Sequence, residues 1–217
     1  MYPFVTHTWN PISGKCLHDC LYCYMKAWPQ KELHLNEKGL LKDNHGKGNF
    51  IFVGSSTDMF AENVTQEWIN LVLQKCRTYE HNHYLFQTKN PVRLEQKFSN
   101  KSMLAVTIET NRDYGFEISH APIISERFYH LIHRSYDYPV MVSIEPIMDF
   151  DTQYFVEGLK DIRPVKISIG ADSQGHNLPE PEPEKLKELI SACKEITEDI
   201  VLKDNLKRLL RMNESLY

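Results

Sequence analysis

Short apolar runs alternate with amphipathic stretches along most of this 217-residue chain. The apolar runs are rich in β-branched and aromatic residues, and they predict strands over 49–53, 84–87, 103–108, 140–144, 165–169 and 200–202. Between them, apolar positions recur every three or four residues, which predicts helices over 66–77, 92–98, 124–134, 152–159, 183–196 and 205–212. Such alternation indicates parallel strands joined by crossover helices.

The length sets the size of the fold. A chain of 217 residues suffices for one sizeable core, so we expect a single domain over residues 1–217. A complete eight-stranded barrel typically needs about 250 residues. The predicted fold class is therefore α/β, a partial TIM barrel of about six β/α units. A C-terminal strand and a basic helix, within residues 200–217, end it.

Polar residues follow five consecutive predicted strands. Loops are polar in general, but active sites of barrels gather at the C-terminal ends of the strands, and several acids and a lysine stand there. These strand ends therefore predict a shared site. The residues concerned are Gly54, Ser55, Ser56, Thr57, Asp58, Gln87, Thr88, Lys89, Asn90, Thr107, Glu109, Thr110, Ser143, Glu145, Pro146, Gly170, Ala171, Asp172 and Ser173.

Composition narrows the possible partners. The chain has 25 Lys and Arg against 29 Asp and Glu, and this balance argues against a broad nucleic-acid-binding surface while leaving a local basic groove open. No apolar run approaches the roughly 20 residues of a membrane span. The N-terminus lacks the basic-then-apolar order of a signal peptide. We therefore expect no membrane contact and a cytoplasmic location, where thiols stay reduced.

Three of the five cysteines, Cys16, Cys20 and Cys23, form a C-x3-C-x2-C triplet. An odd count with three crowded together is no disulfide framework. A four-iron cluster normally takes four thiolates, so three would leave one iron open to another molecule. Cys76 and Cys193 lie on apolar helical stripes, and we expect both in the core.

Histidines leave a second hypothesis open. His18 lies between two cysteines of the triplet, and as a zinc ligand it would complete a Cys3His site, although structural zinc ligands usually come in separated pairs. The alternative function is therefore a non-catalytic zinc or iron–sulfur binding module. His130 and His133 share one helix face without a third ligand, which favours surface or packing roles.

The triplet, with aromatic Tyr22 just before its last cysteine, resembles the radical S-adenosylmethionine (SAM) superfamily. The surrounding sequence is similar to the phage Gp37/Gp68-like family (DUF5131) of radical SAM proteins. The matching segments together run from Thr8 to Ser173, and they are Thr8-Trp9-Asn10-Pro11, Ser13-Gly14, Tyr24, Ser55–Phe60, Gln87-Thr88-Lys89-Asn90, Ile144-Glu145-Pro146 and Ile169-Gly170-Ala171-Asp172.

The resemblance implies a cluster loop, residues 14–24, whose three cysteines hold a [4Fe-4S] cluster with SAM on the fourth iron. One electron, from a donor such as flavodoxin or ferredoxin, cleaves SAM to methionine and a 5'-deoxyadenosyl radical that abstracts hydrogen from the substrate. The cofactors supply the difficult chemistry and the protein supplies position and shielding. A nucleotide, a nucleic acid and a small metabolite are all compatible substrates.

The resemblance also implies roles for single residues around SAM. Tyr22 would pack near the adenine or serve as a core aromatic. The strand end that meets the SAM amino group aligns with Gly54, Ser55 and Ser56. Because Ser56 replaces the usual acid, Asp58 would share its task.

Further roles follow at the other strand ends. Thr107 and Glu109 end the strand that supplies ribose contacts, where a carboxylate accepts strong hydrogen bonds. Lys89 would pair with the SAM carboxylate or an anionic substrate, or remain solvated. Glu145 and Asp172 would face the substrate or the adenine, or cap a helix.

The predicted C-terminal helix is basic. Its cations would contact phosphates or form a solvated helix face, which is common for a terminal helix. This basic patch consists of Lys203, just before the helix, and of Lys207, Arg208 and Arg211 within it. Residues 44–48 lack the order of a phosphate-binding loop and predict a turn.

Overall fold

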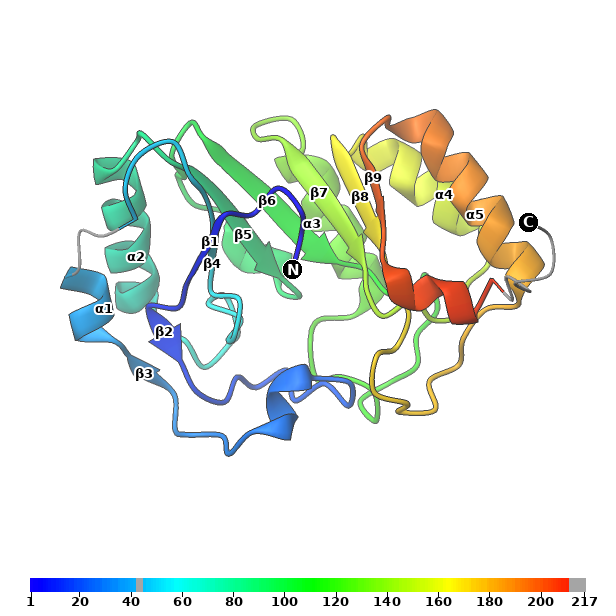
Figure 1. The fold of residues 1–217 in the computed structure, drawn as a ribbon, viewed down its shortest axis with the longest axis horizontal. Coiled ribbons are helices and arrows are strands. Elements are labelled where there is room, and N and C mark those ends of the chain that lie inside the picture. The colour runs from blue at the N-terminus through cyan, green and yellow to red at the C-terminus, as the bar shows by residue number, and fades with distance from the viewer. Residues whose placement is uncertain (42–44, 211–217) are drawn as a thin grey trace.

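A computed structural model describes residues 1–41 and 45–210. Its centre is a seven-stranded parallel sheet that curls into a half-barrel (Figure 1). From edge to edge the strands are β1 (His7–Trp9), β4 (Phe50–Val53), β5 (His83–Thr88), β6 (Ser102–Thr107), β7 (Val140–Ile144), β8 (Lys166–Ile169) and β9 (Ile200–Leu202). The predicted partial barrel is confirmed.

Four longer helices pack on the outer face of the sheet, and short elements carry the connections (Figure 1). The helices are α2 (Gln66–Thr78), α3 (Ile124–Arg134), α4 (Thr152–Ile162) and α5 (Pro183–Ile196). A two-stranded sheet of β2 (Ile12–Ser13) and β3 (His34–Leu35) leads into α1 (Glu37–Leu41). The 3-10 helices are η1 (Tyr24–Ala27), η2 (Pro91–Leu94) and η3 (Asp204–Arg208).

Two predicted helices are wrong in their extent. The helix expected over 92–98 is reduced to η2, because the chain turns inward and buries Phe98, whose ring centroid lies 5.1 Å from that of Phe86. The helix expected over 205–212 is the 3-10 helix η3 in its described part. Arg211 and Met212, like Asn44 of the predicted turn, lie outside the described residues.

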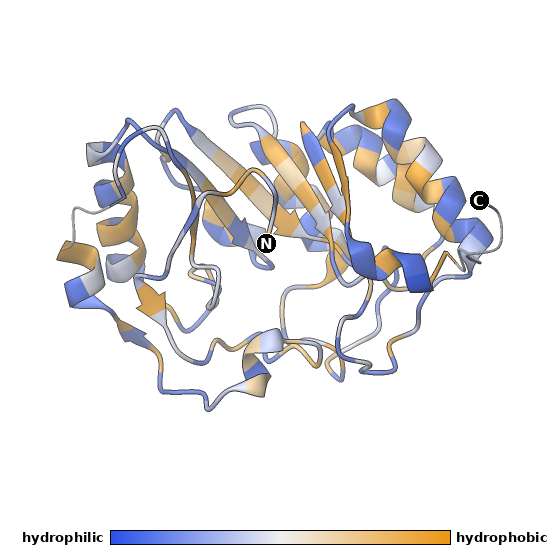
Figure 2. Ribbon diagram, in the orientation of Figure 1, coloured by the Kyte–Doolittle hydropathy of each residue, from blue (hydrophilic) through white to orange (hydrophobic). Residues whose placement is uncertain are grey.

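The main core lies between the outer face of the sheet and the helices. Figure 2 shows apolar residues concentrated along the strands and on parts of the helices, with hydrophilic residues interspersed on the helices. In α2 the buried face is the predicted stripe, which ends in Cys76, and Cys193 is buried in the same way in α5. Both cysteines are core residues, as predicted. Each fully buried valine, leucine or isoleucine of this core contributes about 1.5–3 kcal/mol to the stability of the fold.

The inner, concave face has its own small core, formed with the N-terminal segment. Tyr2 is 6% exposed and packs with Leu85, Ala105 and Met141 of the three central strands. Its ring stacks on Phe4 at a centroid distance of 5.6 Å. The first residues therefore form a floor across the half-barrel, a feature that the alternating pattern did not predict.

Within the described residues, no helix combines the length and the apolar character that crossing a membrane requires.

Candidate functional site

The cysteine loop, residues 14–24, passes beneath the carboxyl ends of the strands (Figure 1). Its backbone is held from two sides by hydrogen bonds. On the β4 side, the Asn63 side chain accepts from the backbone N–H of Leu17 at 3.2 Å. On the β6 side, the backbone N–H of Leu21 donates to Ile118 at 2.8 Å, and the N–H of His120 donates to the carbonyl of His18 at 2.7 Å.

Gly14 lets the loop begin where it does. Its φ is +113°, a conformation that side chains rarely adopt, and a Cβ there would lie 2.4 Å from the carbonyl oxygen of Glu32. Its own carbonyl accepts a 2.8 Å hydrogen bond from the Thr57 hydroxyl at the end of β4. The backbone just before the first cysteine is therefore tied to the sheet through a position that only glycine fits.

All three cysteines of the loop are free thiols. Cys20 is buried, whereas Cys16 and Cys23 are partly exposed. Burial, followed by the negative charge of Asp58, raises the pKa of the Cys16 thiol to about 11. A bound cation would favour its thiolate form instead. Among residues 1–41 and 45–210, no three His, Cys, Asp or Glu side chains gather as ligands of a single ion.

His18 pairs with Asp58. The Nε2 atom of His18 lies 2.8 Å from Oδ2 of the carboxylate, and both side chains are nearly buried. The same carboxylate accepts from the Thr88 hydroxyl and from the backbone N–H of Lys89, each at 2.8 Å, and from the N–H of Phe60 at 2.9 Å. These donors occupy both oxygens. Asp58 thus ties the cysteine loop to the ends of β4 and β5.

The charge state of Asp58 follows from these contacts. Burial raises the pKa of its carboxyl, but His18 and the backbone donors lower that pKa by more than burial raises it. The net shift is therefore downward. A carboxylate with four donors has little capacity left for a ligand. The geometry therefore favours a positioning role for Asp58.

A buried network surrounds Glu109, which is 1% exposed. One oxygen lies 2.7 Å from Arg127 of α3, and the other accepts from the Tyr22 hydroxyl. Lys89 lies 3.8 Å from the same oxygen, with its Nζ 5.3 Å from the centre of the Tyr22 ring. Burial raises the Glu109 pKa, but Arg127 and Lys89 more than offset it, so that the pKa is lowered.

This network joins three predicted site residues, Tyr22, Lys89 and Glu109, and adds one that the sequence reasoning missed. Arg127 is 3% exposed. Its signal was available, because it stands on the apolar face of α3, three residues after Ile124 and four before Leu131. A charged residue on such a face requires a buried partner. Lys89 is not the solvated loop lysine of the alternative interpretation.

A pocket opens beside this network. It is lined by Tyr22 and Glu109, by Arg127 and Met148, and by apolar and polar residues of the loop that follows β6. The loop residues are Thr110, Arg112, Asp113, Tyr114, Gly115, Phe116, Ile118, Ser119, Ala121, Pro122 and Ile123, and Ile124 follows at the start of α3. A mixed apolar and charged lining suits a ligand with both apolar and polar parts.

The end of β4 is held in a turn. Gly54 has a φ of +75°, and a Cβ there would approach the carbonyl oxygen of Thr57 to 3.0 Å. Asn10 accepts from the Ser55 hydroxyl at 3.2 Å and from the backbone N–H of Ser56 at 3.0 Å. The Tyr24 hydroxyl donates to the carbonyl of Ser55 at 2.6 Å. The predicted Gly54–Ser56 segment therefore lies against the cysteine loop.

A polar layer lies on the inner face of the sheet near the carboxyl ends. Thr107 accepts from the Gln87 amide at 3.0 Å. The Tyr2 hydroxyl lies 2.8 Å from the Gln87 oxygen and 3.1 Å from the Ser143 hydroxyl. Burial raises the pKa of Tyr2, so its hydroxyl stays protonated and can donate. Thr107 thus belongs to a layer above the N-terminal floor.

Glu145 and Asp172 stand at the ends of β7 and β8. Glu145 accepts from the Ser168 hydroxyl and has Lys203 at 3.9 Å. Asp172 is 6% exposed and accepts from the backbone of its own loop and from Nδ1 of His176 at 2.7 Å. Asp172 thus caps a loop and not a helix. The sequence analysis did not predict its partner His176.

Comparisons with known proteins now bear on this geometry. The chain matches, over residues 2–204, the family described as "Protein of unknown function (DUF5131)". The chain belongs to the DUF5131 family. Comparison with the curated proteins found no sequence match.

Solved structures share its fold. A spore photoproduct lyase mutant with bound AdoMet and dinucleoside spore photoproduct superposes with a TM-score of 0.66 at 9% identity, over 93% of this chain and 77% of that one. Streptococcus suis SuiB bound to S-adenosylmethionine gives 0.59 at 12% identity, over 98% and 54%. SuiB bound to its precursor peptide SuiA gives 0.60 at 12%, over 99% and 53%. This member of the DUF5131 family therefore shares its half-barrel fold with spore photoproduct lyase and SuiB.

The basic residues near the C-terminus have acidic partners in the described part of the chain. Lys207 lies 3.0 Å from Asp204, and Arg208 forms a two-point contact with Glu180. Lys203 points inward and covers the Tyr2 ring at 4.3 Å. Much of the cationic charge expected to meet phosphates is thus compensated. Arg211 lies outside the described residues.

The paired histidines of α3 have separate contacts. His130 lies 3.9 Å from Glu95, and His133 bonds the carbonyl of Tyr129 at 2.7 Å. Among the described residues, neither belongs to a group of three or more side chains that could hold a metal ion. Their predicted surface and packing roles fit these contacts.

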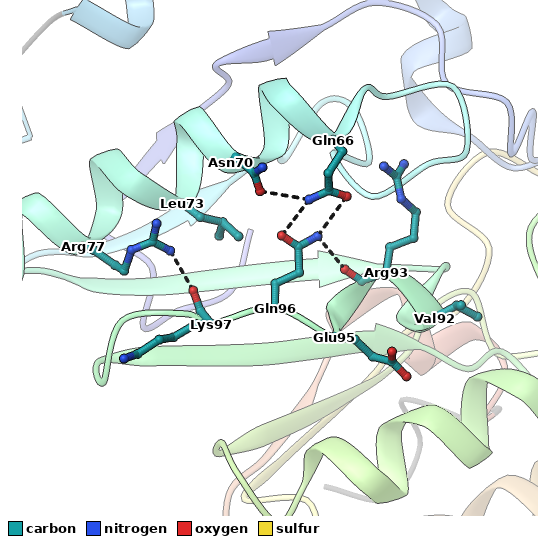
Figure 3. Close-up of a pocket in the computed structure, with 9 residues that line it drawn as sticks. All are labelled: Gln66, Asn70, Leu73, Arg77, Val92, Arg93, Glu95, Gln96 and Lys97. Atoms are coloured by element: carbon teal, nitrogen blue, oxygen red, sulfur yellow. Dashed lines mark hydrogen bonds between the residues drawn. The ribbon is translucent and has the colours of Figure 1, made fainter.

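A second hollow lies on the outside of the barrel, between α2 and the segment around η2 (Figure 3). Its walls are polar: the Gln66 and Gln96 amides bond each other at 2.9 Å, and Arg77 donates to the carbonyl of Lys97 at 2.8 Å. The hollow contains none of the predicted site residues. Residues of the predicted helix over 92–98, from Val92 to Lys97, form one of its sides.

Proposed function

We propose that this protein is a radical SAM enzyme whose cluster is held by Cys16, Cys20 and Cys23. The observation that carries the proposal is a juxtaposition. Three free thiols lie on a loop beneath the carboxyl ends of a parallel half-barrel, and the pocket lined by Tyr22 and Glu109 opens beside them. Carboxyl ends of barrel strands are where such folds place their active sites.

The donor set suits a [4Fe-4S] cluster better than one metal ion. A structural zinc ion needs four ligands around a single point. Within the described residues no three candidate ligands gather in that way, and the Nε2 atom of His18 is bonded to Asp58. In a cubane cluster each thiolate binds its own iron. Three separate thiols on one loop meet that requirement.

With a cluster and SAM bound, reductive cleavage of SAM would supply a 5'-deoxyadenosyl radical that abstracts hydrogen from the substrate. The protein would hold the nucleoside end of SAM in the pocket beside the loop. Tyr22 would provide an aromatic wall for the adenine, and Glu109 would accept from ribose hydroxyls. Arg127 and Lys89 keep that carboxylate ionised and therefore able to accept.

The methionine end of SAM would meet the end of β4. There Gly54, Ser55 and Ser56 form a turn against the cysteine loop, and its backbone and hydroxyl oxygens suit an ammonium group. Thr107 would border the ribose from the inner polar layer. Glu145 and Asp172, at the next strand ends, would face the substrate side.

The substrate class is proposed more broadly, as a nucleotide, a nucleic acid or a small metabolite. The structures that share the fold hold a dinucleoside in one case and a peptide in another, so the fold is compatible with substrates of very different size. The electron would come from a carrier such as flavodoxin or ferredoxin. A non-catalytic zinc or iron–sulfur module is the alternative function.

Oxygen-free reconstitution with iron and sulfide tests the proposal. We expect a brown protein with about four irons per chain that converts SAM and dithionite into 5'-deoxyadenosine, because the triplet holds one cluster. Cys20→Ala should lose both properties. Cys76→Ala, which removes a core thiol, is the matched control and should keep them. A colourless protein with one zinc ion and no SAM cleavage would establish the alternative.

A further inference from the structure

Ser119 lies against the thiol of Cys20, at the joint between two loops. Its Oγ is 3.1 Å from the Cys20 sulfur, which is short for a hydrogen bond to sulfur. Ser119 comes from the loop that follows β6, a hundred residues from the triplet in sequence. No motif included it, and it enters the site only through the fold.

The other hydrogen bonds of the Ser119 side chain determine where its hydroxyl proton points. The backbone N–H of Ala121 donates to the Ser119 oxygen at 3.2 Å, so this N–H occupies the acceptor side. The hydroxyl proton is then left with two acceptors: the Cys20 sulfur at 3.1 Å and the carbonyl of His18 at 3.5 Å. A metal-bound Cys20 is a thiolate without a proton, so it only accepts, and its negative charge makes it the stronger acceptor.

Ser119 is also held firmly in this position. On either side of it, the Ile118 carbonyl accepts from Leu21 and the His120 N–H donates to His18, so that the two loops pair around the contact. This pairing of the two loops keeps the backbone of Ser119 next to Cys20. Groups bonded to a metal ligand set the electronic properties of the metal as well as its position.

We propose that Ser119 donates a hydrogen bond to the cluster ligand Cys20 and thereby raises the reduction potential of the cluster. This inference rests on the proposed function. Hydrogen bonds to the sulfurs of a cluster are one of the factors that set its potential. Reduction adds a negative charge to the cluster and its ligands, so a donor proton stabilises the reduced form more than the oxidised form. Ser119 is a positioning and tuning residue that does not touch the reacting atoms.

The test is an electron paramagnetic resonance redox titration of the reconstituted protein without SAM. In Ser119→Ala we expect the ratio of reduced to oxidised cluster at a fixed potential to fall about tenfold. For a one-electron couple this is a downward shift of the midpoint potential of about 59 mV. Ser119→Thr keeps the hydroxyl and should titrate near the wild type. Ser135→Ala removes a hydroxyl that bonds a carbonyl at the end of α3, and it should leave the potential unchanged.

Iron content separates the outcomes. Equal iron in the wild type and Ser119→Ala with equal potentials overturns the inference and leaves the proposed function standing. Loss of the cluster in Ser119→Ala but not in Ser119→Thr supports the contact, because threonine keeps the hydroxyl and alanine lacks it. Loss in both variants overturns it, since the serine then acts through loop packing. A wild type that takes up no cluster overturns both the inference and the proposed function.

Discussion

The Nε2 atom of His18 lies 2.8 Å from Oδ2 of Asp58, and through this pair the cysteine loop is bonded to the strand ends of the half-barrel. Asp58 receives three further hydrogen bonds from Phe60, Thr88 and Lys89. One carboxylate therefore joins the loop, the end of β4 and the end of β5. Removing its charge should affect both the stability of the fold and the placement of the thiols.

We predict that Asp58→Asn lowers the free energy of unfolding by about 3–5 kcal/mol at neutral pH, as for a buried pair that loses one partner. Its amide also presents a donor where the carboxylate had only acceptors. Urea denaturation of the cluster-free protein measures the loss. Iron uptake after reconstitution should fall as well. An unchanged midpoint and slope would show that the contacts contribute nothing.

The His18–Asp58 pair also predicts that the free energy of unfolding depends on pH. The folded chain holds Asp58 ionised at a lowered pKa, so it binds fewer protons than the unfolded chain, in which an aspartate has a pKa of about 3.9. The stabilisation is complete above that value and is lost as the pH falls through the lower folded pKa. The stability difference between the wild type and Asp58→Asn should therefore shrink on acidification below about pH 4. A difference that stays constant down to pH 2 would contradict this.

The Glu109–Arg127 pair predicts a larger stability cost when one partner is replaced than when both are. Glu109→Gln should cost about 3–5 kcal/mol, because it leaves Arg127 buried without its counter-charge. Combining it with Arg127→Met should recover much of that cost, since replacing both partners of a buried pair is often neutral. Denaturation of the two single variants and the double variant measures the coupling.

A surface pair provides the control for this cycle. Asp204 and Lys207 are both highly exposed and 3.0 Å apart. Asp204→Asn should leave the denaturation midpoint unchanged, because exposed pairs contribute little. Strict additivity of the Glu109 and Arg127 substitutions would contradict the buried network.

The sequence predicts those features that depend on neighbouring residues, and it fails where residues far apart in the chain make contact. The strands around Leu85, Leu104 and Val142 follow from local apolar runs, and so does the buried face of α2 with Cys76. Periodicity is a property of neighbouring residues, so it is visible in a single chain. The helix expected over 92–98 fails because Phe98 finds its place against Phe86, a contact that no local pattern encodes.

The candidate site divides in the same way. The triplet and the strand ends carry short motifs, and the structure places Tyr22, Lys89 and Glu109 in one network. Arg127 and Ser119 join the site only through tertiary contacts, from a helix and a loop without a motif. Their partners lie 18 and 99 residues away in sequence. The apolar face of α3 signals that Arg127 needs a buried partner, but which residue that partner is becomes visible only when the topology is known.

Tyr2 provides a test of the floor beneath the inner polar layer. Tyr2→Phe removes the hydroxyl that bonds Gln87 and Ser143, and it should lower the free energy of unfolding by about 1–3 kcal/mol. Tyr2→Ala also leaves a cavity against Leu85 and Met141 and should cost about 3–5 kcal/mol. Thermal and urea denaturation measure both. Wild-type stability in Tyr2→Ala would show that the N-terminal segment does not pack on the sheet in solution.

Gly14 and Gly48 predict opposite outcomes for the same substitution. Both have positive φ, so alanine is strained by roughly 1–2 kcal/mol at either position. At Gly48 the space around a Cβ is open, whereas at Gly14 it is filled by the backbone of Glu32 at 2.4 Å. Gly14→Ala must therefore displace the backbone that leads into Cys16. We expect it to lose most of the iron taken up on reconstitution, while Gly48→Ala retains wild-type iron with a slightly lower melting temperature. Equal iron in the two variants would show that this close approach does not position the cysteine loop.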